Sequence, residues 1–357
     1  MNNKLNLDEY IIMIPQEENV KTTYLKHRFG EVTLQANILD ISQYIYQQKV
    51  TFIETTNQDT KSDSANIMVI CEKPFIQGTN VDDIPSKGGF IKKDDPRYIP
   101  GLYNKVYTTN SQQISIQYYP YNALLQRDIE DRLMLVACGN YLTATYVTKM
   151  AVKYAISGSY KRQGFYSLHS SAVCRNQKGY LFLAGGRAGK TTIFMNLISR
   201  NFYPINDDMV FWKINDDGIE LSSAPILPNV REESIDYIMN LNYEMIKKYP
   251  IGLGGEYNVD PGTLYNKDFV PSCVLKAIFL PELGYKETQI IPIEDSTKYK
   301  KRILRACITH QKIDVNEDFA LSIRYLMQIP FYKLNVSNNS EEFYYKFNHF
   351  INKHFEE

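Results

Sequence analysis

The chain contains 357 residues, the length of about two domains of ordinary size. Apolar residues make up 44% of the sequence and charged residues 22%, and this composition excludes wholesale disorder. Forty lysines and arginines balance forty aspartates and glutamates, so the formal net charge is zero. Because a general nucleic-acid binder carries a basic excess, we predict no nucleic-acid partner.

The five cysteines are widely separated and form no C-x-x-C pair, a pattern typical of reduced thiols in a cytoplasmic protein. The N-terminal residues contain only a short apolar run beside acidic residues, so no signal peptide is predicted. The longest uncharged stretch, Leu133 to Thr148, is too short and too polar to cross a bilayer. We therefore expect a cytoplasmic protein with no membrane partner.

Residues 1–120 are predicted to form a β-rich α+β N-terminal domain that recognises the substrate. Its candidate strands, rich in β-branched and aromatic residues, are Tyr10–Ile14, Glu31–Leu39, Ile67–Glu72, Val106–Thr109 and Gln113–Tyr119. The residues from Asp82 to Pro100 are dense in Pro, Gly, Lys and Asp and indicate a long surface loop.

Residues 121–160 are predicted to form two linking helices. In the first, apolar residues recur at three- and four-residue steps from Leu124 to Val136. The second follows Gly139 and runs through Tyr141 and Val152.

Residues 161–357 alternate between strand and helix patterns, which favours an α/β sheet domain. The expected strands are Tyr166–Cys174, Tyr180–Ala184, Phe202–Ile205, Val210–Ile214, Ile219–Ser222, Val274–Leu280 and Phe331–Val336. The expected helices are Lys190–Ser199, Glu232–Tyr249 and a terminal helix after the last strand.

The strongest local signal is a P-loop pattern between an apolar strand and an amphipathic helix. Its expected phosphate-binding residues are Gly185, Gly186, Arg187, Ala188, Gly189, Lys190, Thr191 and Thr192. Glycines let backbone N–H groups surround phosphate oxygens, Lys190 neutralises the terminal phosphates, and Thr191 places a hydroxyl on Mg²⁺. The pattern therefore predicts ATP or GTP with Mg²⁺ as cofactors. The strict motif has glycine where this chain has Ala184, and an ordinary glycine-rich turn is the alternative.

Two neighbouring carboxylates and a histidine complete the candidate catalytic group. Asp207 and Asp208 follow an apolar strand, 17 and 18 positions after Lys190, where a P-loop enzyme places a Mg²⁺ ligand or a base. We assign Asp207 as the base and Asp208, with Thr191, to the metal, although the two aspartates are interchangeable on sequence alone. His169 lies on a strand 21 positions before Lys190, and a structural histidine is the alternative interpretation.

The runs LHSSAV, YLFLAGGRAGKTT and PINDDMVFW together resemble the catalytic core of the HPr kinase/phosphorylase family. That resemblance implies a P-loop α/β core that transfers a phosphoryl group to a serine hydroxyl of a protein or peptide. It also implies that Lys190 and Thr191 bind phosphate and Mg²⁺, and that the aspartate pair supplies the base with His169 at the same site. It covers residues 165–215 well and continues weakly to about residue 336.

The Glu-Arg-Gly signature that HPr kinases proper carry after the aspartate pair is absent from this sequence. The chain is more similar to the HPr-kinase-like proteins of peptide natural-product tailoring, which implies a precursor peptide as substrate. Arg231 is a candidate phosphate-stabilising arginine, with a solvated surface arginine as the alternative. Two other functions stay open: a nucleotide-dependent binding or switch protein, and another nucleotide-dependent peptide-modifying transferase. Homo-oligomerisation also stays open.

Overall fold

The computed structural model describes residues 21–36, 63–71, 103–110, 113–119, 123–128, 130–138, 141–186, 188–224, 226–249, 256–308 and 317–356. The chain divides into two compact units, whose main boundary falls between Ser159 and Tyr160. The predicted strand Tyr10–Ile14 and the predicted loop from Asp82 to Pro100 lie outside the described residues.

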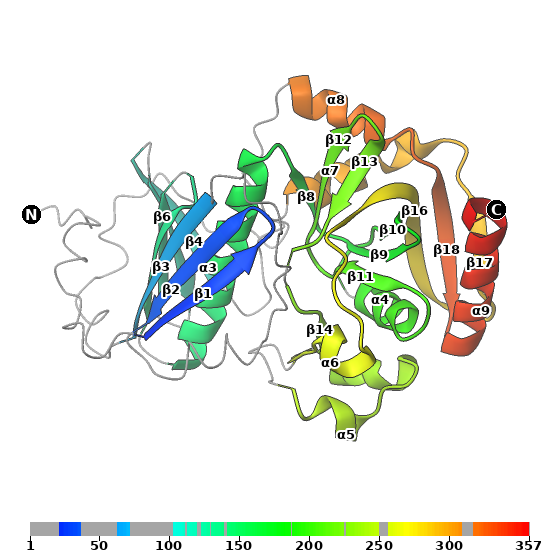
Figure 1. Ribbon diagram of the computed structural model, residues 1–357, viewed down its shortest axis with the longest axis horizontal. Helices are drawn as coiled ribbons and strands as arrows, with labels where there is room; N and C mark the ends of the chain where they lie inside the picture. The colour runs from blue at the N-terminus through cyan, green and yellow to red at the C-terminus, as the bar shows by residue number, and fades with distance from the viewer. Residues whose placement is uncertain are drawn as a thin grey trace, which may run out of the picture. The chain divides into compact units, whose positions relative to one another are not determined.

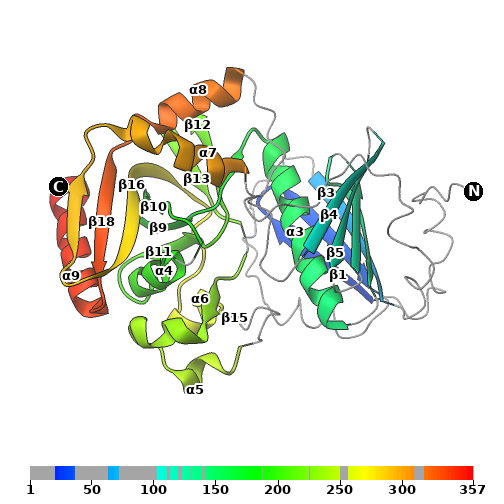
Figure 2. The ribbon, with the colours of Figure 1, turned by 180° about the vertical axis from the view of Figure 1, so that it is seen from behind.

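The first unit contains a seven-stranded mixed sheet with the strand order β1-β2-β3-β7-β6-β5-β4. Its strands are β1 Lys21–His27, β2 Gly30–Ala36, β3 Asp63–Cys71, β4 Tyr103–Asn110, β5 Gln113–Tyr119, β6 Ala123–Asp128 and β7 Leu133–Cys138. Helix α3 (Tyr141–Arg162) crosses one face of this sheet (Figures 1 and 2). Its Tyr154 ring lies under the guanidinium of Arg127 from β6, 4.2 Å from the ring centre. Buried apolar side chains of the sheet and the helix form the core between them.

The first of the two predicted linking helices is wrong, because residues 123–128 form β6 and residues 133–138 form β7. The apolar spacing there suits a helix, but β7 pairs with both β3 and β6 inside the sheet, and a central strand is apolar without a clear period. The Arg132 amide N–H donates to the Asp128 carboxylate over 2.8 Å and holds the turn. The second predicted helix is confirmed as α3.

The second unit is built on a nine-stranded mixed sheet. Seven strands follow the order β11-β9-β10-β16-β13-β12-β8, and β18 pairs with β16 and β17. The bounds are β8 Tyr166–Leu168, β9 Ser171–Arg175, β10 Lys178–Phe182, β11 Tyr203–Asn206, β12 Val210–Asn215, β13 Gly218–Ser222, β16 Ser272–Tyr285, β17 Gln289–Pro292 and β18 Phe331–Ser337. Strands β10, β16 and β18 run parallel, so the predicted α/β class is confirmed for this unit.

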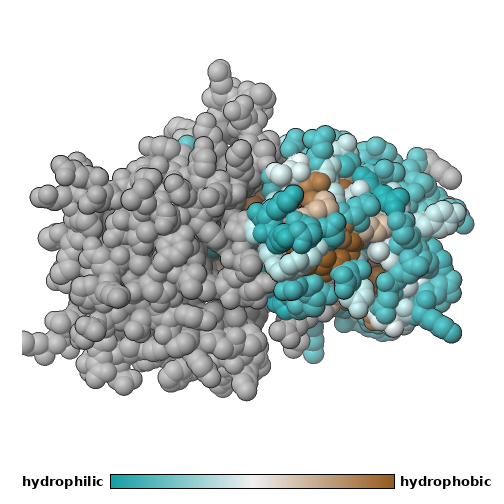
Figure 3. Space-filling model, turned by 90° about the horizontal axis from the view of Figure 1, so that it is seen from below, coloured by the Kyte–Doolittle hydropathy of each residue, from teal (hydrophilic) through white to brown (hydrophobic). Residues whose placement is uncertain are grey.

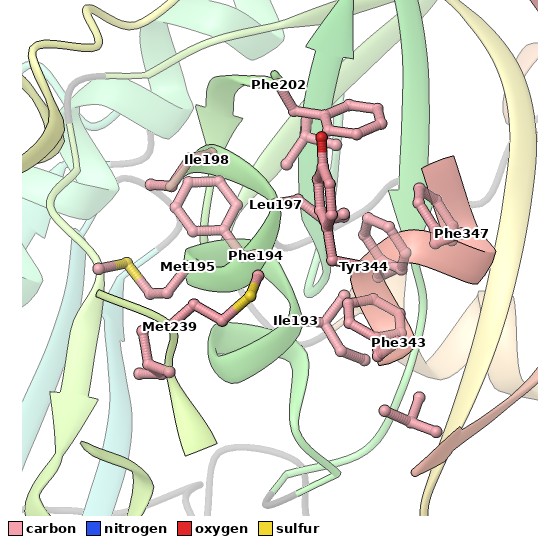
Figure 4. Close-up of a cluster of buried hydrophobic side chains, with 14 of the residues drawn as sticks. Ile193, Phe194, Met195, Leu197, Ile198, Phe202, Met239, Phe343, Tyr344 and Phe347 are labelled. Carbon is pink, nitrogen blue, oxygen red and sulfur yellow. The ribbon is translucent and has the colours of Figure 1, made fainter. Parts of the chain in front are cut away.

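Helices cover both faces of the second sheet. Because neighbouring strand residues point to opposite faces, Phe182 and Phe279 pack under α4 (Lys190–Ile198) and α9 (Ser340–Ile351). Leu181 and Ile278 pack under α7 (Lys300–Ile308) and α8 (Glu317–Leu326). Figure 4 shows the α4 side, where Phe194, Phe343 and Phe347 are among the aromatic side chains that fill the core. Burial of one such side chain is worth about 2 kcal/mol.

The predicted helix Glu232–Tyr249 is wrong over most of its length. A 3₁₀ helix spans Glu232–Tyr237 and α5 spans only Tyr243–Ile246. Asn240 between them adopts a left-handed conformation with φ 57°, which ends regular helix. The remaining elements are strands β14 Asn229–Arg231 and β15 Glu256–Asn258, helix α6 Pro261–Tyr265, a 3₁₀ helix Ser296–Tyr299 and a π-helix Asn352–Glu356.

Hydrophilic residues predominate on the face of the second unit in Figure 3, with hydrophobic residues visible near its centre. Within the ranges that the structure describes, no helix combines the length and apolarity needed to cross a membrane.

Candidate functional site

The predicted P-loop follows β10 directly and leads into α4. The Leu183 N–H donates to the Phe279 carbonyl over 2.9 Å, so the loop leaves the sheet beside β16. Gly189 has φ +80°, a conformation that favours glycine, and α4 begins at the next residue. Ala184 is buried and has no positive φ, so alanine fits where the strict motif has glycine. Arg187 lies outside the described residues.

The ammonium group of Lys190 is held over the loop by three acceptors. Its Nζ donates to the carbonyls of Ala184 and Gly185, each at 2.9 Å. It also lies 3.3 Å from Nε2 of His169. The side chain is only 8% exposed, and burial lowers the pKa of Lys190, while Asp207 and Asp208 oppose that shift. Each ammonium proton therefore has an acceptor, and the positive charge sits at the P-loop with little solvent to screen it.

Thr191 connects the P-loop helix to the aspartate pair. Its hydroxyl donates a hydrogen bond to Oδ2 of Asp207 over 2.7 Å. Asp207 follows β11, which runs antiparallel to β9 as β10 does. Strands β10 and β11 are therefore parallel, and their carboxyl ends meet at one edge of the sheet, where ligands bind in open α/β sheets.

Asp207 is a buried acid with unused hydrogen-bonding capacity. The residue is 2% exposed, and its Oδ1 has no hydrogen-bond partner among the described residues. Burial raises the pKa of Asp207 from 3.8 to about 6, against the opposing hydrogen bond from Thr191 and the positive charge of Lys190. An unpaired buried carboxylate oxygen is costly, and a cation ligated there would satisfy it.

His169 lies in the bend between β8 and β9, which corrects the single strand predicted for Tyr166–Cys174, and it bridges Lys190 and Asp208. Its Nδ1 lies 3.0 Å from the Asp208 carboxylate and 3.1 Å from the Asp208 carbonyl oxygen. With Nδ1–H as the donor, Nε2 is left to accept from Lys190, which assigns the neutral tautomer from the network. The backbone of Asp208 is left-handed, with φ 78°, and its carboxylate contacts His169. The Asp208 side chain is 26% exposed.

Five predicted residues therefore meet at one place: His169, Lys190, Thr191, Asp207 and Asp208. Gly185 and Gly186 are exposed in the loop, Ala188 and Gly189 close it, and Thr192 lies in the first turn of α4.

Arg231 pairs elsewhere, because its guanidinium donates to Glu256 at 2.8 and 3.0 Å. Sequence reasoning missed Leu283, whose side chain lies against Gly189; no local motif marks it.

The donor set at this edge fits Mg²⁺. Magnesium favours oxygen ligands and is held by one or two carboxylates together with substrate phosphates, and Thr191 and Asp207 offer a hydroxyl and a carboxylate side by side. No cluster of three or more histidines, cysteines or carboxylates suited to a metal occurs among the described residues. Such a cluster is not needed when phosphates supply ligands.

No protein-family model matches the chain, and no curated protein matches its sequence. Among solved structures, the chain is similar to the Hpr(Ser) kinase/phosphatase from Coxiella burnetii, with 12% sequence identity and a TM-score of 0.28. The similarity covers 53% of this chain and 95% of that chain.

Proposed function

We propose that the protein is a kinase that transfers the γ-phosphoryl group of ATP or GTP to a serine or threonine hydroxyl of a peptide or protein. The observation that carries the proposal is the hydrogen bond from Thr191 to the buried carboxylate of Asp207, beside the P-loop ammonium of Lys190. A hydroxyl and an acid joined at a phosphate-binding loop are the pair with which P-loop enzymes hold Mg²⁺.

The geometry favours exchanging the two aspartate roles expected from the sequence. Asp207 is buried and bonded to Thr191, which suits a metal ligand. Asp208 is partly exposed and oriented by His169, which suits a base that must reach an incoming hydroxyl. Bound Mg²⁺ would neutralise charge on the β- and γ-phosphates.

Asp208 would accept the proton of the acceptor hydroxyl while the hydroxyl oxygen bonds to the γ-phosphorus. The bond from the γ-phosphorus to the β–γ bridging oxygen then breaks, and the nucleoside diphosphate leaves. Lys190 would stabilise the charge on the transferred group. His169 would hold Asp208 in place and keep the ammonium oriented.

The substrate class implied by the sequence resemblance is a precursor peptide in natural-product biosynthesis. The first unit would recognise it, and one way is the addition of a strand to β1 or β4, the outermost strands in the described sheet order. A homo-oligomer is compatible with this function but not required by it.

Mass spectrometry after incubation with Mg²⁺, ATP and a candidate peptide tests the proposal. We expect one added phosphate on a serine or threonine, and none when Lys190→Ala replaces the wild type. A whole added nucleotide would instead indicate nucleotidyl transfer. If the protein binds nucleotide tightly but phosphorylates no serine- or threonine-containing precursor peptide encoded beside its own gene, a binding or switch protein is favoured.

A further inference from the structure

Strand β16 continues past the point where β10 ends. The last pair between them is Phe182 with Phe279, whereas β16 and β18 stay paired to Tyr285 and Ser337. Because β10 and β16 are parallel, the extra residues of β16 lie on the same edge of the sheet as the P-loop. The end of β16 therefore borders the site where phosphates are proposed to bind.

Leu283, on this extension, touches the P-loop itself. A Cβ added to Gly189 would lie 2.5 Å from Cδ1 of Leu283 and 2.7 Å from Cδ2, so the leucine fills the space that a larger residue at 189 would need. The side chain is nevertheless 46% exposed. A large apolar side chain thus stands beside the phosphate loop with nearly half of its surface open.

The neighbouring charged residues lie on the other face of β16. Glu282 pairs with Lys333 at 3.0 Å and accepts from the Tyr285 hydroxyl over 2.8 Å. Successive strand residues point to opposite faces, so Leu283 faces the α4 side with Phe279, while Glu282 faces away. The surface that Leu283 presents beside Gly189 is therefore aliphatic.

We propose that Leu283 is the platform on which the base and ribose of the nucleotide rest, an inference that depends on the proposed kinase function. In this proposal Lys190 and the aspartates would contact the γ-phosphate, and the nucleoside would extend over Leu283, which lies against Gly189. An aliphatic side chain contacts the face of any base without hydrogen bonding to its edge. This platform therefore accepts ATP and GTP with similar affinity.

Binding measurements with three probes test this assignment: ATP, GTP and inorganic tripolyphosphate, which has the phosphates but no nucleoside. Leu283→Ala should weaken ATP and GTP roughly tenfold, the order expected when one leucine contact is lost, and leave tripolyphosphate unchanged. Leu283→Met should retain nucleotide affinity. Ile291→Ala, at an exposed position on β17, is the matched control and should change nothing.

Three outcomes overturn the inference. Equal weakening of tripolyphosphate by Leu283→Ala means that the leucine only supports the loop. Unchanged nucleotide affinity means that the leucine makes no contact with the nucleotide. Weaker binding of only ATP or only GTP means that Leu283 discriminates between the two bases. Lys190→Ala tests the proposed function separately from the role of Leu283. If this variant binds ATP, GTP and tripolyphosphate as tightly as the wild type, the P-loop binds no phosphate and the proposed function fails.

Discussion

Thr191 and Asp207 are joined by a hydrogen bond of 2.7 Å, although the strands that precede them, β10 and β11, are not neighbours in the sheet. Thr191 lies in the first turn of α4, which follows β10, and Asp207 follows β11, with β9 lying between the two strands. Helix α4 therefore spans β9 to bring the hydroxyl to the acid. This contact ties the start of α4, directly after the glycine-rich loop, to the aspartate pair.

Removing the charge from each aspartate in turn separates their roles. Asp207→Asn should lower the affinity for Mg²⁺ and nucleotide together, because the carboxylate beside Thr191 is lost, and should reduce phosphoryl transfer by about 10²-fold or more. Asp208→Asn should reduce kcat by a similar factor, typical of a lost general base, with nucleotide affinity nearly unchanged. Isothermal titration calorimetry and steady-state kinetics measure the two effects.

Asp217→Asn, at an exposed position in the turn after β12, serves as the control and should behave as the wild type. If Asp208→Asn instead loses Mg²⁺ binding while Asp207→Asn keeps it, the two assignments are reversed, as the sequence first suggested.

Stability should depend on pH through Asp207. Burial raises its pKa from 3.8 to about 6, so between these pH values the folded protein retains a proton that the unfolded chain releases, and stability falls as pH rises. Above pH 6 the ionised buried acid costs about 3 kcal/mol in the free protein. Asp207→Asn should therefore raise the free energy of unfolding at pH 7.5 by about that amount, with the gain disappearing towards pH 4.

Urea denaturation without nucleotide or Mg²⁺ measures this gain at both pH values, with Asp217→Asn as reference. A gain that is equal at pH 4 and pH 7.5 would show that ionisation of Asp207 is not its source.

That these residues meet at one place was predictable from the sequence, because a P-loop motif restricts the residue types and their order. Gly189, Lys190 and Thr191 follow one another as the P-loop motif at a helix start requires. The spacing to the aspartates predicted a strand directly beside the P-loop strand, but β9 lies between β10 and β11 in the sheet. Which aspartate meets Thr191 was not predictable. That choice depends on the left-handed backbone of Asp208, which no residue spacing encodes.

The fold was less predictable where apolar residues suit two periods. The spacing from Leu124 to Val136 fits a helix, yet pairing with β3 and β5 makes these residues strands, an outcome decided by distant partners. Likewise, the contact between Leu283 and Gly189 joins residues far apart in sequence, and no sequence motif links the two positions.

Replacing His169 should separate orientation from binding. In His169→Gln the imidazole bridge between Lys190 and Asp208 is lost, whereas Lys190 keeps its bonds to the carbonyls of Ala184 and Gly185. We expect kcat to fall about 10²-fold with little change in nucleotide affinity. His349→Gln, exposed on α9, is the control. A KM for nucleotide that rises as steeply as kcat falls would show that His169 holds the phosphate instead.

Gly189 should tolerate a side chain poorly, chiefly because of its backbone. Its φ of +80° is strained for alanine, at about 1–2 kcal/mol, and the Leu283 side chain would have to shift to make room for a Cβ. Gly189→Ala should therefore lower the free energy of unfolding by about 2 kcal/mol or more and weaken nucleotide binding. Gly186→Ala is the matched control for stability, because a Cβ there meets nothing within 4 Å.

The double variant Gly189→Ala with Leu283→Ala divides the cost between its two sources. Removal of the leucine relieves the close contact but leaves the backbone strain. The double variant should therefore lose less unfolding free energy than the two single variants lose together, but it should stay less stable than Leu283→Ala alone. Chemical denaturation of the four proteins measures the coupling. Full additivity would mean that the two side chains do not meet, and a Gly189→Ala variant as stable as Gly186→Ala would contradict the left-handed geometry of the loop.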